Sequence, residues 1–105
     1  MKIIWTDFAI ENLKEIYNFY AQKAGKKIAN RIKLKIFEST KQLSKNPESG
    51  QLEPSLENLQ QNHRYLVSGN YKIIYRLFDN QIAIVDIFDA RQEPKKILDE
   101  NRNKN

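Results

Sequence analysis

The sequence lacks cysteine entirely and contains a single histidine, His63. Without cysteine there is no disulfide framework, no cysteine-based zinc site and no thiol nucleophile, which fits a reducing cytoplasm. One histidine and scattered acids give no metal-ligand cluster. With three glycines in the chain, there is also no glycine-rich nucleotide loop, and no GxSxG turn occurs. These absences argue against metal, nucleotide and serine-hydrolase chemistry, and we expect neither a metal nor a cofactor.

Long apolar runs are missing as well. No stretch approaches the roughly 18 residues needed to cross a bilayer. The run at residues 1–5 is too short for a signal peptide, because polar Thr6 and Asp7 follow it at once. We therefore expect a cytoplasmic protein with no membrane partner. The 105 residues fit one domain, predicted over residues 1–98, with a polar tail over 99–105. A net charge of +5 favours polyanions or an acidic protein as partners.

The first half of the chain predicts a strand followed by two helices. Residues 2–5 are apolar and β-prone, which indicates an edge strand, and Thr6 or Asp7 can cap the next element. Apolar residues then recur at helical spacing to about Lys23, and Gly25 can end that helix. A second apolar stripe runs from Ile28 to Leu43, so we expect an antiparallel helical hairpin.

The second helix is rich in positive charge. Residues 23–45 contain eight Lys and Arg and one acid, Glu38. Such a run favours a solvated helix face, and the alternative is a docking surface for nucleic acid or for an acidic partner.

The segment from Asn46 to Asn62 predicts a long loop that contains no Lys or Arg. Asn46-Pro47 ends the second helix, since the residue before proline avoids helical geometry. Three leucines are expected to hold the loop to the domain, with one helical turn at residues 55–59: Leu52, Leu56 and Leu59. Long loops in compact domains are usually functional or mobile.

Residues 63–91 predict a three-stranded antiparallel meander with turns at Ser68-Gly69-Asn70 and Asp79-Asn80. Alternation over residues 71–78 gives one apolar or aromatic face, whereas Lys72 and Arg76 lie on the other, a candidate anion-binding face. Asp86 interrupts an apolar strand that should lie centrally, so it is expected to be paired or functional. Pro94 can begin a short helix to Leu98. The fold class is α+β, with the helical hairpin packed on a small antiparallel sheet.

The order of these elements resembles the RelE/ParE superfamily, the toxins of type II toxin-antitoxin or plasmid-stabilisation modules. The resemblance covers nearly the whole chain and rests on five pieces of sequence: Ile4-Trp5-Thr6 with Ala9 and Leu13, Leu43 to Pro47 with Gly50, Arg64, Gly69 to Tyr75, and Arg91. The superfamily contains ribosome-dependent endoribonucleases of RelE and YoeB type and ParE-type inhibitors of DNA gyrase. Both are neutralised by an antitoxin.

The nuclease patterns match this sequence only partly. RelE-like members carry lysines in the loop before the meander, and this loop has none. YoeB-like members use a Glu-Pro pair, an Arg on the middle strand and a terminal His, whose positions here hold Glu53-Pro54, Lys72 and, near the last, Asp89 or Arg91. Lys72 cannot form the planar, bidentate hydrogen bonds of an Arg. The terminal histidine, the side chain best suited to proton transfer near neutral pH, is absent. His63 is expected to be a surface or strand-edge residue.

The resemblance therefore favours a ParE-like toxin that inhibits an essential target such as DNA gyrase and is held inactive by a cognate antitoxin. We expect no enzymatic activity, and a homodimer or a toxin-antitoxin hetero-oligomer is consistent with the family. The alternative is a metal-independent endoribonuclease acting on ribosome-bound mRNA, and a further one is an inert relative or basic nucleic-acid-binding domain. Candidate catalytic residues are Glu53, Arg64, Lys72, Arg76 and Arg91, and candidate binding residues are Arg64, Lys72, Arg76, Asp89 and Arg91.

Overall fold

A computed structural model describes residues 1–91 of the chain. The predicted helix from Pro94 to Leu98 and the tail 99–105 lie outside the described residues. No helix within residues 1–91 is long and apolar enough to cross a membrane. The elements, in chain order, are β1 (Ile3–Trp5), α1 (Asp7–Ala24), α2 (Lys26–Thr40), the 3-10 helix η1 (Lys41–Ser44), β2 (Gln51–Leu52), the 3-10 helix η2 (Pro54–Leu59), β3 (Arg64–Ser68), β4 (Tyr71–Phe78) and β5 (Gln81–Asp89).

The five strands form one sheet in the order β1-β5-β4-β3-β2, which confirms the α+β class and the meander. The meander is antiparallel as predicted, and β1 is the expected edge strand, which pairs with β5 in parallel. The helical hairpin allows this arrangement, because it returns the chain across the sheet before the meander begins. The two-residue strand β2, which extends the other edge beside β3, was not predicted.

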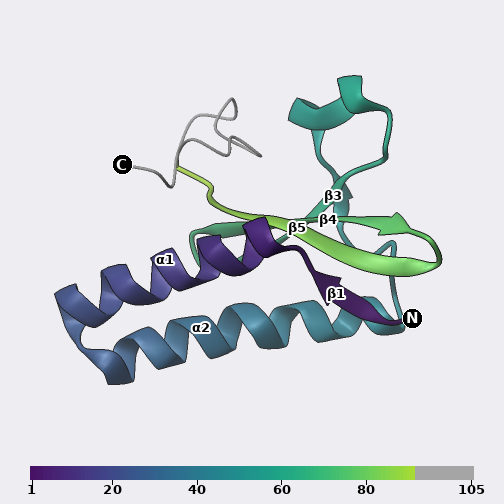
Figure 1. The fold of residues 1–105 in the computed structure, drawn as a ribbon. Coiled ribbons are helices and arrows are strands. Elements are labelled where there is room, and N and C mark those ends of the chain that lie inside the picture. Colours follow the sequence, from purple (N-terminus) through teal and green to yellow (C-terminus); the bar gives the residue numbers. More distant parts are fainter. Residues whose placement is uncertain (92–105) are drawn as a thin grey trace.

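The hairpin of α1 and α2 covers one face of the sheet (Figure 1). Thr6 caps α1 by accepting a hydrogen bond from the Ala9 amide at 3.1 Å. Gly25 ends α1 with φ of 93°, a backbone angle that residues with a side chain rarely adopt. The core beneath the hairpin is formed by completely or almost completely buried apolar residues: Ala9, Ile36, Leu43, Ile73, Tyr75, Ile82, Ile84 and Ile87.

Strand β5, which lies between β1 and β4 inside the sheet, and the turn before it follow the predicted pattern. Asp79 and Asn80 have φ of 50° and 59°, the positive pair that a tight β4-β5 hairpin requires. Asp86 is fully buried, and the Asn12 side-chain amide of α1 donates to its carboxylate at 2.7 Å. This contact confirms that Asp86 is paired, and it ties the sheet to the hairpin.

Tyr75 of β4 attaches the start of the loop between η1 and β3. The Tyr75 hydroxyl donates to the Pro47 carbonyl at 2.8 Å and accepts from the Gly50 amide at 2.9 Å. Farther along, η2 stands on the side of the sheet opposite the two helices (Figure 1). Of the three loop leucines only Leu56 is buried; Leu52 and Leu59 are 56% and 45% exposed, so their predicted anchoring role was wrong.

Candidate functional site

The face of the sheet away from α1 and α2, called here the open face, carries three of the six predicted site residues, Glu53, Lys72 and Arg76. Strand alternation directs Ile73 and Tyr75 into the helix-covered core, while Ile74 packs in a second cluster on the open face. Successive side chains of a strand point to opposite faces, so Lys72 and Arg76 lie on the open face together with Ile74. The predicted division of β4 into an apolar face and a cationic face is therefore confirmed.

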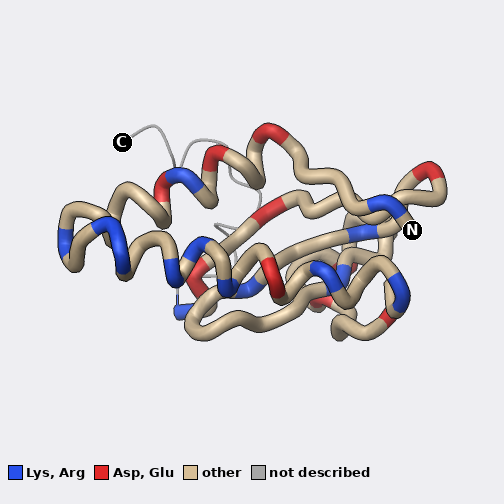
Figure 2. Tube along the Cα trace, turned by 90° about the horizontal axis from the view of Figure 1, so that it is seen from below, with Lys and Arg blue, Asp and Glu red and all other residues tan. Residues whose placement is uncertain are grey.

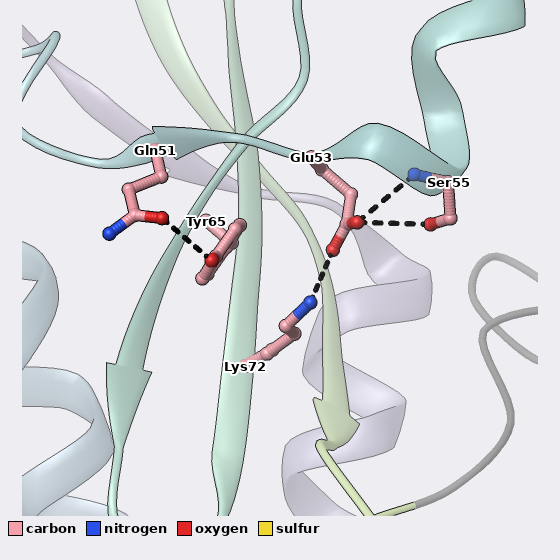
Figure 3. A network of polar contacts seen from close by, with 5 residues as sticks. All are labelled: Gln51, Glu53, Ser55, Tyr65 and Lys72. Atoms are coloured by element: carbon pink, nitrogen blue, oxygen red, sulfur yellow. Dashed lines mark hydrogen bonds and ion pairs between the residues drawn. The ribbon is translucent and has the colours of Figure 1, made fainter.

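An ion pair between Glu53 and Lys72 lies at the centre of the polar part of this face (Figure 3). The Lys72 ammonium lies 2.9 Å from the Glu53 carboxylate and 4.2 Å from the centroid of the Tyr65 ring. The backbone amide and hydroxyl of Ser55 donate to the same carboxylate at 3.2 and 3.1 Å. The Tyr65 hydroxyl in turn donates to Gln51 at 2.9 Å. The loop and the sheet are thereby linked through charged and polar side chains.

The surroundings of Glu53 keep it ionised. Its side chain is 3% exposed, and burial alone would raise its pKa; the hydrogen bond and charge of Lys72 and the two Ser55 donors outweigh burial, so the pKa lies below its ordinary value. The positive charge of Lys72 is neutralised by this internal carboxylate. A phosphate approaching Lys72 would have to compete with Glu53, which makes Lys72 a weak anion ligand while the pair is intact.

A small hydrophobic cluster covers the middle of the open face. Leu56 of η2 packs onto Ile74 and Phe88, with Tyr65 and Val85 beside them. Burial of these side chains explains why η2 remains on the sheet although the loop contains few apolar residues. The open face is therefore not a bare cationic surface, because its centre is shielded from solvent.

His63 lies directly before β3, as expected of a strand-edge residue, but it is not on the surface. His63 is 4% exposed, and its carbonyl accepts from the Glu53 amide at 2.8 Å, which continues the pairing of β2 with β3. The Nδ1 of His63 and the Nε of Arg76 are both buried and have no hydrogen-bond partner within the described residues. Burial first, and then the charge of Arg76, lower the pKa of His63 below 6.5. The loop that covers this strand edge accounts for the burial.

His63→Gln is expected to flatten the dependence of stability on pH. Since the folded-state pKa of His63 is lowered, the unfolded chain binds more protons below pH 6.5, and the free energy of unfolding falls as the pH drops toward the folded-state pKa. Glutamine removes the titrating group. Urea unfolding between neutral and mildly acidic pH measures the effect, with the double substitution His63→Gln and Arg76→Gln as a further comparison. An unchanged slope in His63→Gln would contradict it.

Arg64, the first residue of β3, lies on the face of the sheet that the helices cover, opposite the open face. It pairs with Tyr75 across the strands, and its Nη1 donates to the Gly50 and Glu48 carbonyls at 2.8 and 3.4 Å. No ion pair involves Arg64 within residues 1–91. Arg64 instead braces the Pro-Gly loop through its backbone.

Asp89 and Arg91 lie together at the end of β5. Two guanidinium nitrogens of Arg91 contact the Asp89 carboxylate, Nη2 at 2.8 Å and Nε at 3.0 Å. The Arg91 side-chain hydrogen bond is the main cause of the lowered pKa of Asp89. The predicted site residues therefore fall into three places: Glu53, Lys72 and Arg76 on the open face, Arg64 under the loop, and the Asp89-Arg91 pair at the strand end.

Three residues of the polar network were not singled out from the sequence: Gln51, Ser55 and Tyr65. Gln51 lies in β2 beside Tyr65 of β3, whereas Ser55 lies in the first turn of η2, next to the residue that caps it, Glu53. A strand of two residues has no apolar periodicity, so only the pairing with β3 reveals it.

The comparisons with known proteins agree with this geometry. The family described as "ParE toxin of type II toxin-antitoxin system, parDE" matches residues 3–94. The chain belongs to this family. The predicted ParE-like resemblance is thereby confirmed, and the chain is a type II toxin by family. No curated protein matches it.

A solved structure from the "Chromosomal ParDE TA system from P. aeruginosa" is similar to this ParE-family chain. The TM-score is 0.70 at 24% sequence identity, and the match covers 85% of this chain and 95% of the other. The likeness shows a shared fold.

Proposed function

We propose that this protein is a ParE-type toxin that inhibits DNA gyrase by binding and is neutralised by a cognate antitoxin. Membership of the ParE family over residues 3–94 is the observation that carries the proposal. The site geometry supports binding over catalysis. Glu53 is buried and tied to Lys72, and Arg64 is engaged with backbone carbonyls, so neither is placed to move a proton or hold a phosphate.

A supercoiling reaction with purified gyrase and relaxed plasmid tests the target. Addition of the toxin is expected to stop supercoiling or to trap cleaved DNA, and prior addition of the antitoxin should restore activity. A topoisomerase I relaxation reaction is the control, since a general DNA effect would inhibit both enzymes. Unchanged supercoiling at saturating toxin would remove gyrase as the target.

The antitoxin is expected to carry an acidic, amphipathic segment that covers part of the open face. Val67 and Phe78 remain 59% and 51% exposed there, and the Arg76 guanidinium lies 4.9 Å from the Phe78 ring centroid. Apolar side chains of the partner would bury the first two, and a carboxylate would meet Arg76. Arg76→Glu should then weaken antitoxin binding by about tenfold or more, measured by calorimetry.

A second candidate function is ribosome-dependent cleavage of mRNA. The specific observation that favours it is the position of His63, which lies beside Arg76 on the face that also holds Glu53 and Lys72. Histidine is the group best suited to proton transfer near neutral pH. Toeprinting on programmed ribosomes tests this function, and a message left intact at high toxin concentration excludes it.

A further inference from the structure

Helix α2 presents a straight row of three exposed cations, Lys27, Arg31 and Lys35, on the side away from the core. The row follows the i, i+4 spacing, so its members lie about 6 Å apart along the helix and span roughly 12 Å. Figure 2 shows Lys and Arg on successive turns of α2. A rigid helix holds these charges in a fixed line.

The charges of this row are not used inside the described part of the protein. Four other cations have internal acidic partners: Lys14 pairs with Glu11, Lys41 with Glu38, Lys72 with Glu53, and Arg91 with Asp89. Lys2, Lys26 and Lys45 resemble the row in having no acidic partner within residues 1–91. Lys23 and Lys33 lie over the rings of Phe19 and Tyr17. No ion pair or ring contact within residues 1–91 involves a member of the row.

The row also lowers the stability of the helix that carries it. Like charges at i and i+4 repel each other, and cations near a helix start oppose its dipole. The first turn of α2 holds no acid, and Gly25 provides no capping side chain. Each cost is only a few tenths of a kcal/mol, but all of them lower the stability of α2. An external polyanion would remove them.

We propose that the row Lys27, Arg31 and Lys35 binds the phosphate backbone of duplex DNA. The row contains no aromatic residue, which argues against single strands, whose bases stack on aromatic side chains. Leu34 is the one large exposed apolar residue between Arg31 and Lys35, at 54%, whereas a docked protein segment needs a cluster of apolar anchors. The choice of DNA rests on the proposed function, because gyrase holds duplex DNA. The row lies on the hairpin and the open face lies across the sheet, so one molecule could contact DNA and a protein at once.

Fluorescence anisotropy of the full-length protein with a short labelled duplex DNA tests this inference in the absence of gyrase. The wild type should bind at low salt, and the triple variant Lys27→Gln, Arg31→Gln and Lys35→Gln should reduce the slope of log K against log[salt] by about 3, one per phosphate contact. The matched control is Lys2→Gln, Lys14→Gln and Lys45→Gln, which removes the same charge from exposed positions outside α2. The control should change the slope much less.

Four outcomes would overturn the inference. They are absence of wild-type binding at low salt, equal losses in the two triple variants, equally tight binding of duplex RNA, and a row variant that loses the antitoxin while keeping DNA. The gyrase proposal fails separately. A toxin that binds DNA through the row but leaves supercoiling unchanged supports the row and removes only the target, whereas inhibition of gyrase without DNA binding removes only the row.

Discussion

Gly50→Ala is expected to lower the free energy of unfolding by roughly 3 kcal/mol, at the upper end of the range for overpacked sites. A Cβ at this position would lie 2.6 Å from the Tyr65 carbonyl oxygen and 2.7 Å from both Cε1 and the hydroxyl oxygen of Tyr75. Two of these atoms belong to the fully buried Tyr75 side chain and one to the backbone of β3, so none can move away without disturbing the sheet.

The expected result includes loss of the loop attachment. The Gly50 amide donates to the Tyr75 hydroxyl, and the Gly50 carbonyl accepts from Arg64 at 2.8 Å. Displacing the glycine therefore loosens contacts from two strands at once. Urea unfolding gives the change in stability, and amide hydrogen exchange over residues 46–62 reports the loop. A stability within about 1 kcal/mol of wild type would contradict the overpacking account.

Gly69→Ala is the matched control. Gly69 has φ of 58°, and nothing lies within 4 Å of a Cβ built there, so alanine meets backbone strain without a collision. The expected cost is about 1 to 2 kcal/mol. Tyr75→Phe separates the hydrogen bonds from the space requirement. It should cost about 1 to 3 kcal/mol, because the Gly50 amide and the Pro47 carbonyl lose their partner.

The sequence predicted the elements whose cause is local. The Thr6 cap, the Gly25 break and the Asp79-Asn80 turn each follow from the conformations that those residues allow. Alternation in β4 correctly assigned Lys72 and Arg76 to one face. Each of these features is decided within a few residues of the chain.

What the sequence did not predict depends on partners far along the chain. The parallel pairing of β1 with β5 joins Ile4 to Ala83, and no periodicity specifies such a neighbour. His63 is buried by the loop that precedes it, and Gly50 needs space because of a tyrosine 25 residues away. The sequence named Glu53 and Lys72 separately as candidate site residues. Their direct contact depends on the register of β2, β3 and β4, which the sequence did not predict.

Lys72→Met is expected to lower the free energy of unfolding by about 2 kcal/mol. Breaking a fully buried ion pair costs roughly 3 to 5 kcal/mol, and the value here is reduced because the Lys72 side chain is 25% exposed. The substitution leaves the Glu53 carboxylate buried with only the Ser55 donors. Lys14→Met is the control, since its pair with Glu11 is 66% and 62% exposed and should contribute less than about 1 kcal/mol.

The pH dependence distinguishes a lost charge partner from lost packing. In the wild type the lowered pKa of Glu53 adds stability above its ordinary value of 4.5, and this stability is lost as the pH falls through the folded-state pKa. Without Lys72, burial is expected to raise that pKa, so the carboxyl group takes up a proton and the defect shrinks in acid. The difference between variant and wild type should therefore be largest at neutral pH. A constant difference across pH would indicate lost packing instead.

The double variant Glu53→Gln and Lys72→Met completes the cycle and bears on function. It removes both charges, so its stability should lie closer to wild type than that of Lys72→Met alone. Glu53→Gln alone keeps the ammonium over the Tyr65 ring but frees it from its carboxylate. If the pair restrains Lys72 from binding phosphate, this variant gains RNA affinity at low salt while the double variant does not. Equal affinity in both would show that the pair serves to hold the loop to the sheet and that the open face acts through protein contacts.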